Sequence, residues 1–148
     1  MEFPITPSPL YTVIFAGFIS LITLTIGALF IWFAFSASSL SASLSQSSLQ
    51  VHLPIYGRSI PLSALDIDSA KIVDLNHSSE LKPRTRSNGI GLPGFSVGWF
   101  RLHNGEKALS AITSRENVLY LKTSENYSLL LSLTEPEIFL SQLNKHYQ

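Results

Sequence analysis

The stretch LYTVIFAGFISLITLTIGALFIWFAF, residues 10–35, decides how the chain is organised. It contains no charged residue, no His, Asn or Gln, and no Pro. About 20 consecutive apolar residues are enough to cross the hydrocarbon core of a bilayer as a helix, and this run is longer. The sequence therefore predicts one transmembrane helix over residues 10–35, preceded by a short tail, residues 1–9.

Two amphipathic aromatic residues lie near the ends of the apolar run. In a helix, Tyr11 and Trp32 are separated by roughly 31 Å, which is about one hydrocarbon thickness. Tyr and Trp concentrate at both interfaces of a bilayer, because their rings are apolar and their tips are polar. We therefore predict that Tyr11 and Trp32 lie at the two interfaces of a single-pass membrane protein.

Two other interpretations of the apolar run are a cleaved signal peptide and a helix buried in a soluble core. A signal peptide has a basic segment before a shorter apolar core, whereas residues 1–9 contain no Lys or Arg. The small residues 36–38 are the feature that favours cleavage. A soluble core helix has polar residues along one side. Thr23 and Thr25 come closest to such an interruption, and both can bond to their own helix.

The composition of the 148-residue chain limits the classes of function. Its formal net charge is zero, which argues against general nucleic-acid binding. It has no cysteine, which excludes disulfides and thiol catalysis. All ten Lys and Arg residues follow the apolar run, and Arg58 is the first of them. Arg58 is at or past the distance from the helix within which basic residues set orientation, whereas the short tail has no basic residue and is cheap to move across the membrane, so we expect a cell-membrane protein with its domain in the cytoplasm.

The chain after the apolar run reads as a serine-rich linker, residues 36–40, and one small domain, residues 41–148. About 110 residues are enough for one hydrophobic core and too few for two. Alternating apolar and polar residues predict short strands, Asn104-Gly105 predicts a hairpin turn, and a second hairpin is predicted across residues 124–126. The polar stretch 76–96 is predicted to be a long loop. The predicted strands cover residues 41–45, 49–53, 58–60, 70–75, 97–103, 108–113, 118–123 and 127–132.

Near the C-terminus, apolar residues recur at helical spacing and no longer alternate with polar residues. Thr134 and Glu137 fit a capping box, and Pro136 fits the first turn of a helix. Apolar residues follow at helical spacing; they are Ile138, Phe139, Leu140 and Leu143. We predict a helix over residues 135–147 that plugs one end of a mainly β domain, an antiparallel sandwich or small barrel. Phe139 is then expected to be buried against strand side chains.

Short strands followed by one closing helix are typical of a pleckstrin-homology-like (PH-like) domain. The residues LQVHLPIYGRSIPLSAL (49–65) and GIGLPGFSVGWFRLHNGEKAL (89–109), followed by VLYLKT (118–123), resemble the bacterial PH-domain family. The resemblance covers roughly residues 41–145. It implies a module that is often joined to membrane helices and that binds or assembles rather than catalyses.

Lys82, Arg84 and Arg86 are the most suggestive cluster of candidate binding residues. Cations on a loop stiffened by Pro83 suit lipid phosphates, because each basic residue near an anionic membrane contributes about 1 kcal/mol. Their spacing resembles the basic loop of phosphoinositide-binding PH domains, although that loop joins the first two strands and this cluster follows several. A solvated loop without a ligand is the competing interpretation.

No group of residues has the sequence pattern of a catalytic, metal or cofactor site. Residues 89–94 match G-x-G-x-x-G, but the dinucleotide motif needs a strand before it and a helix after it, so a turn is predicted. The four His residues lack metal-ligand spacing. Asp66, Asp68 and Asp74 lack the pattern of a calcium loop. We therefore expect neither enzyme activity nor a cofactor.

Two functions follow from these expectations. The first is a membrane-tethered PH-like module that binds a protein partner, or a second copy of itself, close to the lipid bilayer. The alternative is a sensor of anionic lipid headgroups that uses Lys82, Arg84 and Arg86. No nucleic-acid partner is expected.

Overall fold

The computed structural model describes residues 9–37 and 40–147 of the chain. The chain divides into two compact units, residues 1–38 and residues 39–148, which are described separately below. The predicted tail lies outside the described residues except for Pro9, and so do residues 38 and 39 of the predicted linker.

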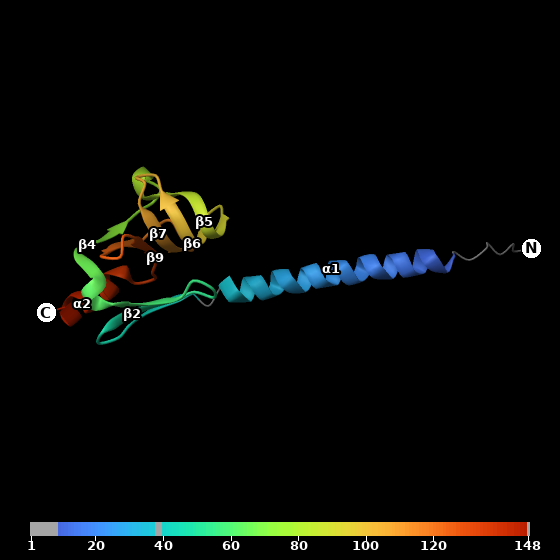
Figure 1. Ribbon diagram of the computed structural model, residues 1–148, viewed down its shortest axis with the longest axis horizontal. Helices are drawn as coiled ribbons and strands as arrows, with labels where there is room; N and C mark the ends of the chain where they lie inside the picture. Colours follow the sequence, from blue (N-terminus) through green and yellow to red (C-terminus); the bar gives the residue numbers. More distant parts are fainter. Residues whose placement is uncertain (1–8, 38–39, 148) are drawn as a thin grey trace, which may run out of the picture. The chain divides into compact units, whose positions relative to one another are not determined.

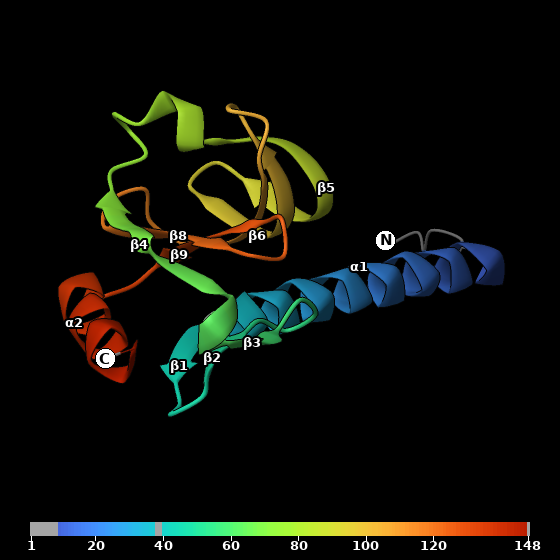
Figure 2. The ribbon, with the colours of Figure 1, turned by 60° about the vertical axis from the view of Figure 1, so that its left-hand side comes forward.

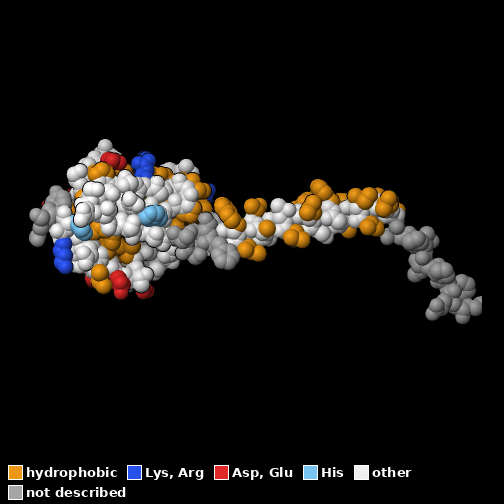
Figure 3. Space-filling model, turned by 90° about the horizontal axis from the view of Figure 1, so that it is seen from below, with side chains coloured by type: hydrophobic (Ala, Val, Ile, Leu, Met, Phe, Trp, Pro, Cys, Tyr) orange, Lys and Arg blue, Asp and Glu red, His pale blue; other side chains and the backbone are white. Residues whose placement is uncertain are grey.

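Helix α1, Leu10–Ala37, contains the apolar run and extends into the first residues of the predicted linker. Its side chains are exposed throughout residues 10–32, and hydrophobic side chains follow one another along it (Figure 3). The span from residue 10 to residue 32 is long and apolar enough to cross a membrane. An apolar helix that is exposed on all sides is not the buried helix of a soluble core.

The two threonines of α1 are satisfied within the helix. The Thr23 hydroxyl donates to the Ile19 carbonyl at 2.9 Å, and the Thr25 hydroxyl donates to the Leu21 carbonyl at 2.8 Å. Bonds of this kind remove the cost of a polar group in an apolar environment. The threonines therefore do not interrupt the apolar character of the helix.

The remaining described residues form a β domain with two sheets (Figures 1 and 2). The smaller sheet is antiparallel, with order β1-β2-β3, and the larger has order β4-β8-β9-β7-β6-β5. Strands β4 and β5 end the larger sheet and are not paired with each other in the described residues, so the domain is a PH-like sandwich and not a closed barrel. The strands are β1 Ser41–Leu44, β2 Ser48–His52, β3 Arg58–Pro61, β4 Leu65–Val73, β5 Pro83–Leu92, β6 Phe95–Leu102, β7 Lys107–Ile112, β8 Val118–Thr123 and β9 Ser128–Ser132.

Both predicted hairpins form. The Leu102 N–H donates to the Glu106 carbonyl at 2.8 Å and the Thr123 N–H donates to the Tyr127 carbonyl at 3.0 Å, and each of these bonds encloses three loop residues. Strands β6 and β7 pair across residues 103–105, and Gly105 has φ +88°. Strands β8 and β9 pair across residues 124–126, and Asn126 has φ 60°. A turn followed by a residue in the left-handed region is a common hairpin connection, and Gly and Asn tolerate that region best. The Asn-Gly signal thus identified the hairpin, although the loop is one residue longer than predicted.

Two features of the larger sheet differ from the sequence predictions. Strand β5 occupies half of the stretch 76–96 that was predicted to be a loop, so that prediction is wrong. Strands β7 and β9 pair in parallel, whereas a fully antiparallel domain was expected. The strand that follows β7 in the chain, β8, does not pair with it. The tight β8–β9 hairpin places β9 between β8 and β7, where β9 runs parallel to β7.

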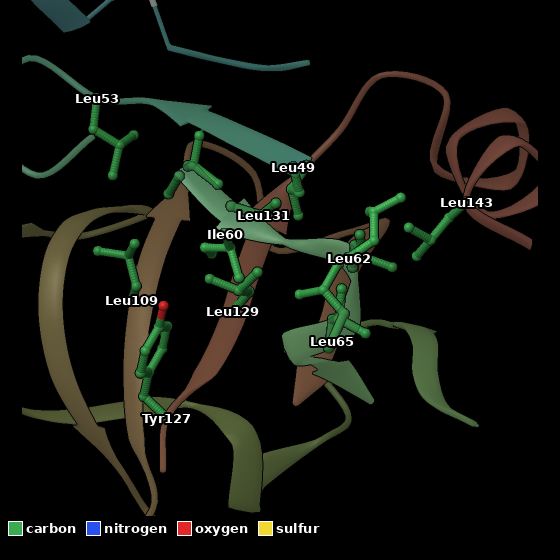
Figure 4. Close-up of a cluster of buried hydrophobic side chains, with 14 of the residues drawn as sticks. Leu49, Leu53, Ile60, Leu62, Leu65, Leu109, Tyr127, Leu129, Leu131 and Leu143 are labelled. Atoms are coloured by element: carbon green, nitrogen blue, oxygen red, sulfur yellow. The ribbon is translucent and has the colours of Figure 1, made fainter. Parts of the chain in front are cut away.

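The main core lies between the two sheets. Leu49 and Ile60 of the smaller sheet face Leu129 and Leu131 of the larger sheet, and all four are at most 2% exposed (Figure 4). A second cluster on the other face of the larger sheet includes Leu102 and several further buried residues. Buried positions alternate along β2 and along residues 98–102 of β6, which matches the predicted period of two.

Helix α2, Pro136–Tyr147, confirms the predicted C-terminal helix and lies beside β4 (Figure 2). Its first backbone bond runs from Phe139 N–H to the Glu135 carbonyl. Glu135 therefore holds the N-cap position that the predicted capping box gave to Thr134. Phe139 is only half-buried against the core, whereas Leu143 is completely buried. Leu143 therefore has the buried position that was predicted for Phe139, because the side of α2 that carries Leu143 faces the sheets.

Candidate functional site

The three predicted basic residues are not equivalent in the structure. Lys82 follows the short turn η2, Ser79–Leu81, and its ammonium donates to the Asn76 carbonyl at 3.2 Å. Arg84 and Arg86 lie on β5, are exposed, and form no ion pair within the described residues. Lys82 therefore helps to hold its own loop, while the two arginines extend from a strand.

Strand β5 is a free edge of the larger sheet. Among the described residues it pairs with β6 alone, and its register shifts between Pro83 and Thr85 and between Arg86 and Asn88. Bulges and charged side chains are ways in which proteins limit pairing at an exposed edge. From Asn88 to Leu92 the register is regular. This part of the edge can accept another strand, and the arginines give its neighbourhood a positive charge.

A second cluster surrounds Trp99, and nothing in the local sequence pointed to it. The Trp99 cluster consists of Arg58, Trp99, Arg101, Lys107 and Tyr127. The Arg58 guanidinium lies 5.1 Å from the centre of the Trp99 ring, and the Lys107 ammonium lies 4.4 Å from it. The Tyr127 ring packs against Trp99 edge-to-face, with ring centres 5.1 Å apart. These contacts link β3 of the smaller sheet to the larger sheet through cation–π and aromatic packing.

The hydroxyl of Tyr127 is buried and makes no hydrogen bond within the described residues. Figure 4 shows this hydroxyl pointing into the core toward Leu109. Burial raises the pKa of the Tyr127 phenol, the charge of Glu125 raises it further, and Arg58 opposes both effects. Tyr127 therefore remains neutral, and it contributes to the cluster by packing its ring against Trp99.

On the other face of the larger sheet, Glu106 accepts three interactions. The Tyr120 hydroxyl donates to it at 2.6 Å and the Ser128 hydroxyl at 3.0 Å, and the Lys122 ammonium lies 3.3 Å away. Burial by itself would raise the pKa of Glu106, but these hydrogen bonds outweigh burial and lower it. Burial and the Glu106 bond raise the pKa of Tyr120. These contacts satisfy the hydrogen-bonding capacity of the Glu106 carboxylate, and they leave none of these described groups poised for proton transfer.

We expect Glu106→Gln to destabilise the domain at neutral pH by about 1–2 kcal/mol, because it removes charge-assisted hydrogen bonds. The pKa of Glu106 is lowered below its ordinary value of 4.5 in the fold. The charged form is therefore stabilising above pH 4.5, and this stabilisation is lost as the pH falls through the lowered pKa. Chemical denaturation at neutral pH and at about pH 3 measures the effect.

The free-energy difference between wild type and Glu106→Gln should shrink at the lower pH. Glu116→Gln is the matched control, because the Glu116 carboxylate is exposed and makes no ion pair in the described chain. A difference that stays constant or grows on acidification would contradict the assigned role of Glu106.

The remaining motifs have structural explanations. Residues 89–92 are the end of β5 and only residues 93–94 form the turn to β6, so most of the G-x-G-x-x-G match is strand where a turn was predicted, and a strand follows it in place of the helix that the dinucleotide motif needs. The Asp74 carboxylate accepts from the Asn76 backbone at 2.7 Å and contacts His77 at 2.8 Å, and these contacts lower its pKa. No group of three metal-ligating side chains occurs among the described residues.

Comparison with known proteins gives one match. The family model described as "Bacterial PH domain" matches residues 40–147, which is more than half of the chain. No curated protein and no solved structure matches the chain. The matched range coincides with the two sheets and α2, and it does not include α1.

Proposed function

Since the chain belongs to the bacterial PH domain family, we propose that it is a membrane-anchored, non-catalytic module that binds a protein partner close to the bilayer. PH domains in general are non-catalytic modules that bind lipids or proteins. The observation that carries the proposal is the presence, in one chain, of this domain and of an apolar helix exposed along its length.

The features of α1 support its role as the anchor. Tyr11 and Trp32 are 74% and 66% exposed and lie roughly 31 Å apart along the helix axis, which suits the two interfaces. The tail, residues 1–9, carries no Lys or Arg and can cross the membrane at low cost, which supports a cytoplasmic domain at the cell membrane. The anchor would keep every binding surface of the domain within a short distance of the lipid.

We expect Leu24→Arg to reduce membrane insertion sharply, because an Arg near the centre of a membrane helix costs about 2.5–3.5 kcal/mol on insertion scales. Carbonate washing of membranes measures insertion: wild type stays in the pellet and the variant moves to the supernatant. A reporter that is active only in the cytoplasm should be active when it is fused after Gln148. Leu24→Phe is the matched control, since it keeps the helix apolar. Wild-type protein released by carbonate, or an externally active reporter, would contradict the anchor or its orientation.

The edge strand β5 supports the proposed docking of a protein. Its outer backbone groups have no partner in the described residues, and a partner strand can pair with such an edge. The exposed Arg84 and Arg86 would favour a partner segment with acidic side chains. A strand added here would continue the larger sheet beyond β5.

A photoreactive residue at Ser87, which is exposed on β5, tests this docking in native membranes. We expect a light-dependent adduct with a protein of defined mass, reduced several-fold by combined Arg84→Glu and Arg86→Glu substitutions. The same photoreactive residue at Gln142, exposed on α2, should give no such adduct, and Lys145→Glu should leave the Ser87 adduct unchanged. Absence of a protein adduct at Ser87 would contradict docking at β5.

The second candidate function is sensing of anionic lipid by Lys82, Arg84 and Arg86. The exposure of the two arginines, without an ion pair in the described chain, favours it. The same experiment separates the candidates, because lipid binding predicts adducts with phospholipid in place of protein. It also predicts that the fragment 39–148 binds anionic vesicles and loses this binding at high salt.

A further inference from the structure

The Trp99 cluster gathers positive charge on one face of the larger sheet. Arg101 of β6 is the direct cross-strand partner of Lys107 of β7. Two like charges in opposite positions on neighbouring strands destabilise a sheet unless an opposite charge compensates them. Arg58 of β3 contacts the same Trp99 ring as Lys107, so two cations lie against one aromatic side chain, and Arg101 is opposite Lys107 on the neighbouring strand.

The carboxylates of the described residues do not neutralise these cations. The described ion pairs are Asp74 with His77 and Glu106 with Lys122. Arg101 donates to the Gly105 carbonyl at 3.0 Å, which is a backbone contact. Glu125, whose charge acts on Tyr127, is the acidic neighbour of the cluster and forms no ion pair with it. The cluster therefore carries an excess of positive charge.

A pocket of about 300 Å³ adjoins the cluster and shares Lys107 and Tyr127 with it. Its wall adds hydroxyl, amide and ammonium donors; the further lining residues are Glu106, Lys122, Thr123, Asn126 and Ser128. The Glu106 carboxylate in this wall is already held by Tyr120, Ser128 and Lys122. The pocket therefore adjoins the cluster at Lys107 and Tyr127, while Glu106, Lys122 and Ser128 in its wall belong to the opposite face of the sheet.

We propose that the Trp99 cluster and the adjoining pocket bind an acidic segment of a protein partner, with carboxylates on Arg58, Arg101 and Lys107 and an apolar contact on Trp99. Trp, Tyr and Arg are the residue types that carry most of the binding energy at protein interfaces, and here they contact one another. Arginine forks suit carboxylates in two-point contacts. This proposal depends on the proposed function in one respect, which is that the chain binds a protein partner.

Trp99 itself reports binding. The chain has two tryptophans, so Trp32→Phe leaves Trp99 as the only one. The full chain with this substitution, in nanodiscs of phosphatidylcholine, is titrated with hexaglutamate at constant ionic strength while Trp99 fluorescence is recorded. We expect a saturable change in emission, and about a tenfold or larger loss of affinity when Arg58→Ala and Lys107→Ala are combined.

The controls separate charge recognition from damage to the fold. Arg115→Ala removes an exposed cation outside the cluster and should leave the affinity unchanged. Arg58→Lys with Lys107→Arg keeps both charges and should restore most of the affinity, even if the alanine variants lower the thermal midpoint. Hexaglutamine should not bind.

Three results would overturn the proposal. They are no saturable response to hexaglutamate, equal loss of affinity in Arg115→Ala, and a response to inorganic phosphate or to phosphatidylserine nanodiscs but not to hexaglutamate. The last result would identify a phosphate site. Because docking at β5 is read from Ser87 adducts, those adducts would persist if only the Trp99 proposal fails.

Discussion

Gly98→Ala should destabilise the domain by about 3 kcal/mol or more, which approaches the whole stability of a small domain. Gly98 has φ +115°, a conformation that residues with a side chain rarely adopt. A Cβ atom at this position would lie 2.6 Å from the Asn88 carbonyl oxygen and 2.6 Å from the Gly89 Cα. Since both neighbours are backbone atoms of β5, the substitution would force β5 and β6 apart.

The measurement is chemical denaturation of the fragment 39–148, which contains both core clusters. Gly91→Ala is the matched control on the same pair of strands. Its Cβ would lie 3.3 Å from Cε1 of the Phe100 side chain, which can shift, so we expect a cost of about 1 kcal/mol or less. Equal midpoints for Gly98→Ala and wild type would show that β5 does not pair closely with β6.

Leu143→Ala should destabilise the domain by about 2–5 kcal/mol, the usual cost of truncating a buried leucine. Leu143 is 0% exposed and belongs to the main core, where it extends from α2 toward Leu62 (Figure 4). Its loss would leave a cavity at this buried position, because the surrounding side chains relax only partially. Thermal unfolding of the fragment 39–148 measures the effect.

Two other positions on α2 calibrate this result. Ile138 is 54% exposed, so Ile138→Ala should change the midpoint little. Phe139 is half-buried, so Phe139→Ala should fall between the two. An unchanged midpoint for Leu143→Ala would mean that α2 is an appendage and not part of the PH-like domain.

The features that the sequence identified are those with a strong local signal. The apolar run of α1 needs no tertiary partner to be recognised, since its length and lack of charge distinguish it from other helices. The hairpins and α2 were found from alternation, turn residues and helical spacing, which are written within about ten consecutive residues. The resemblance to the bacterial PH-domain family rested on such stretches, and the family match confirms it.

Strand β5 was not predicted because its pairing with β6, and not its own residue pattern, makes it a strand. Its side chains are mostly exposed or half-buried, so they show no alternation, and it contains Gly89 and Gly91. Its backbone pairs with β6 through close contacts that glycine permits at Gly89 and Gly98. An edge strand with one paired side and little burial gives no periodic signal, so propensity alone assigns it to a loop.

The sequence by itself determined the apolar helix, the hairpins, the closing helix and the basic character of residues 82–86, because each depends on residues that are close together in the chain. Only the tertiary structure decided which of these residues act together. It assigns Lys82 to its own loop and leaves Arg84 and Arg86 exposed on an edge. It also brings Arg58, Trp99 and Lys107 into contact from three different strands. Contacts between distant residues depend on how the sheets pack, and no local pattern records that packing.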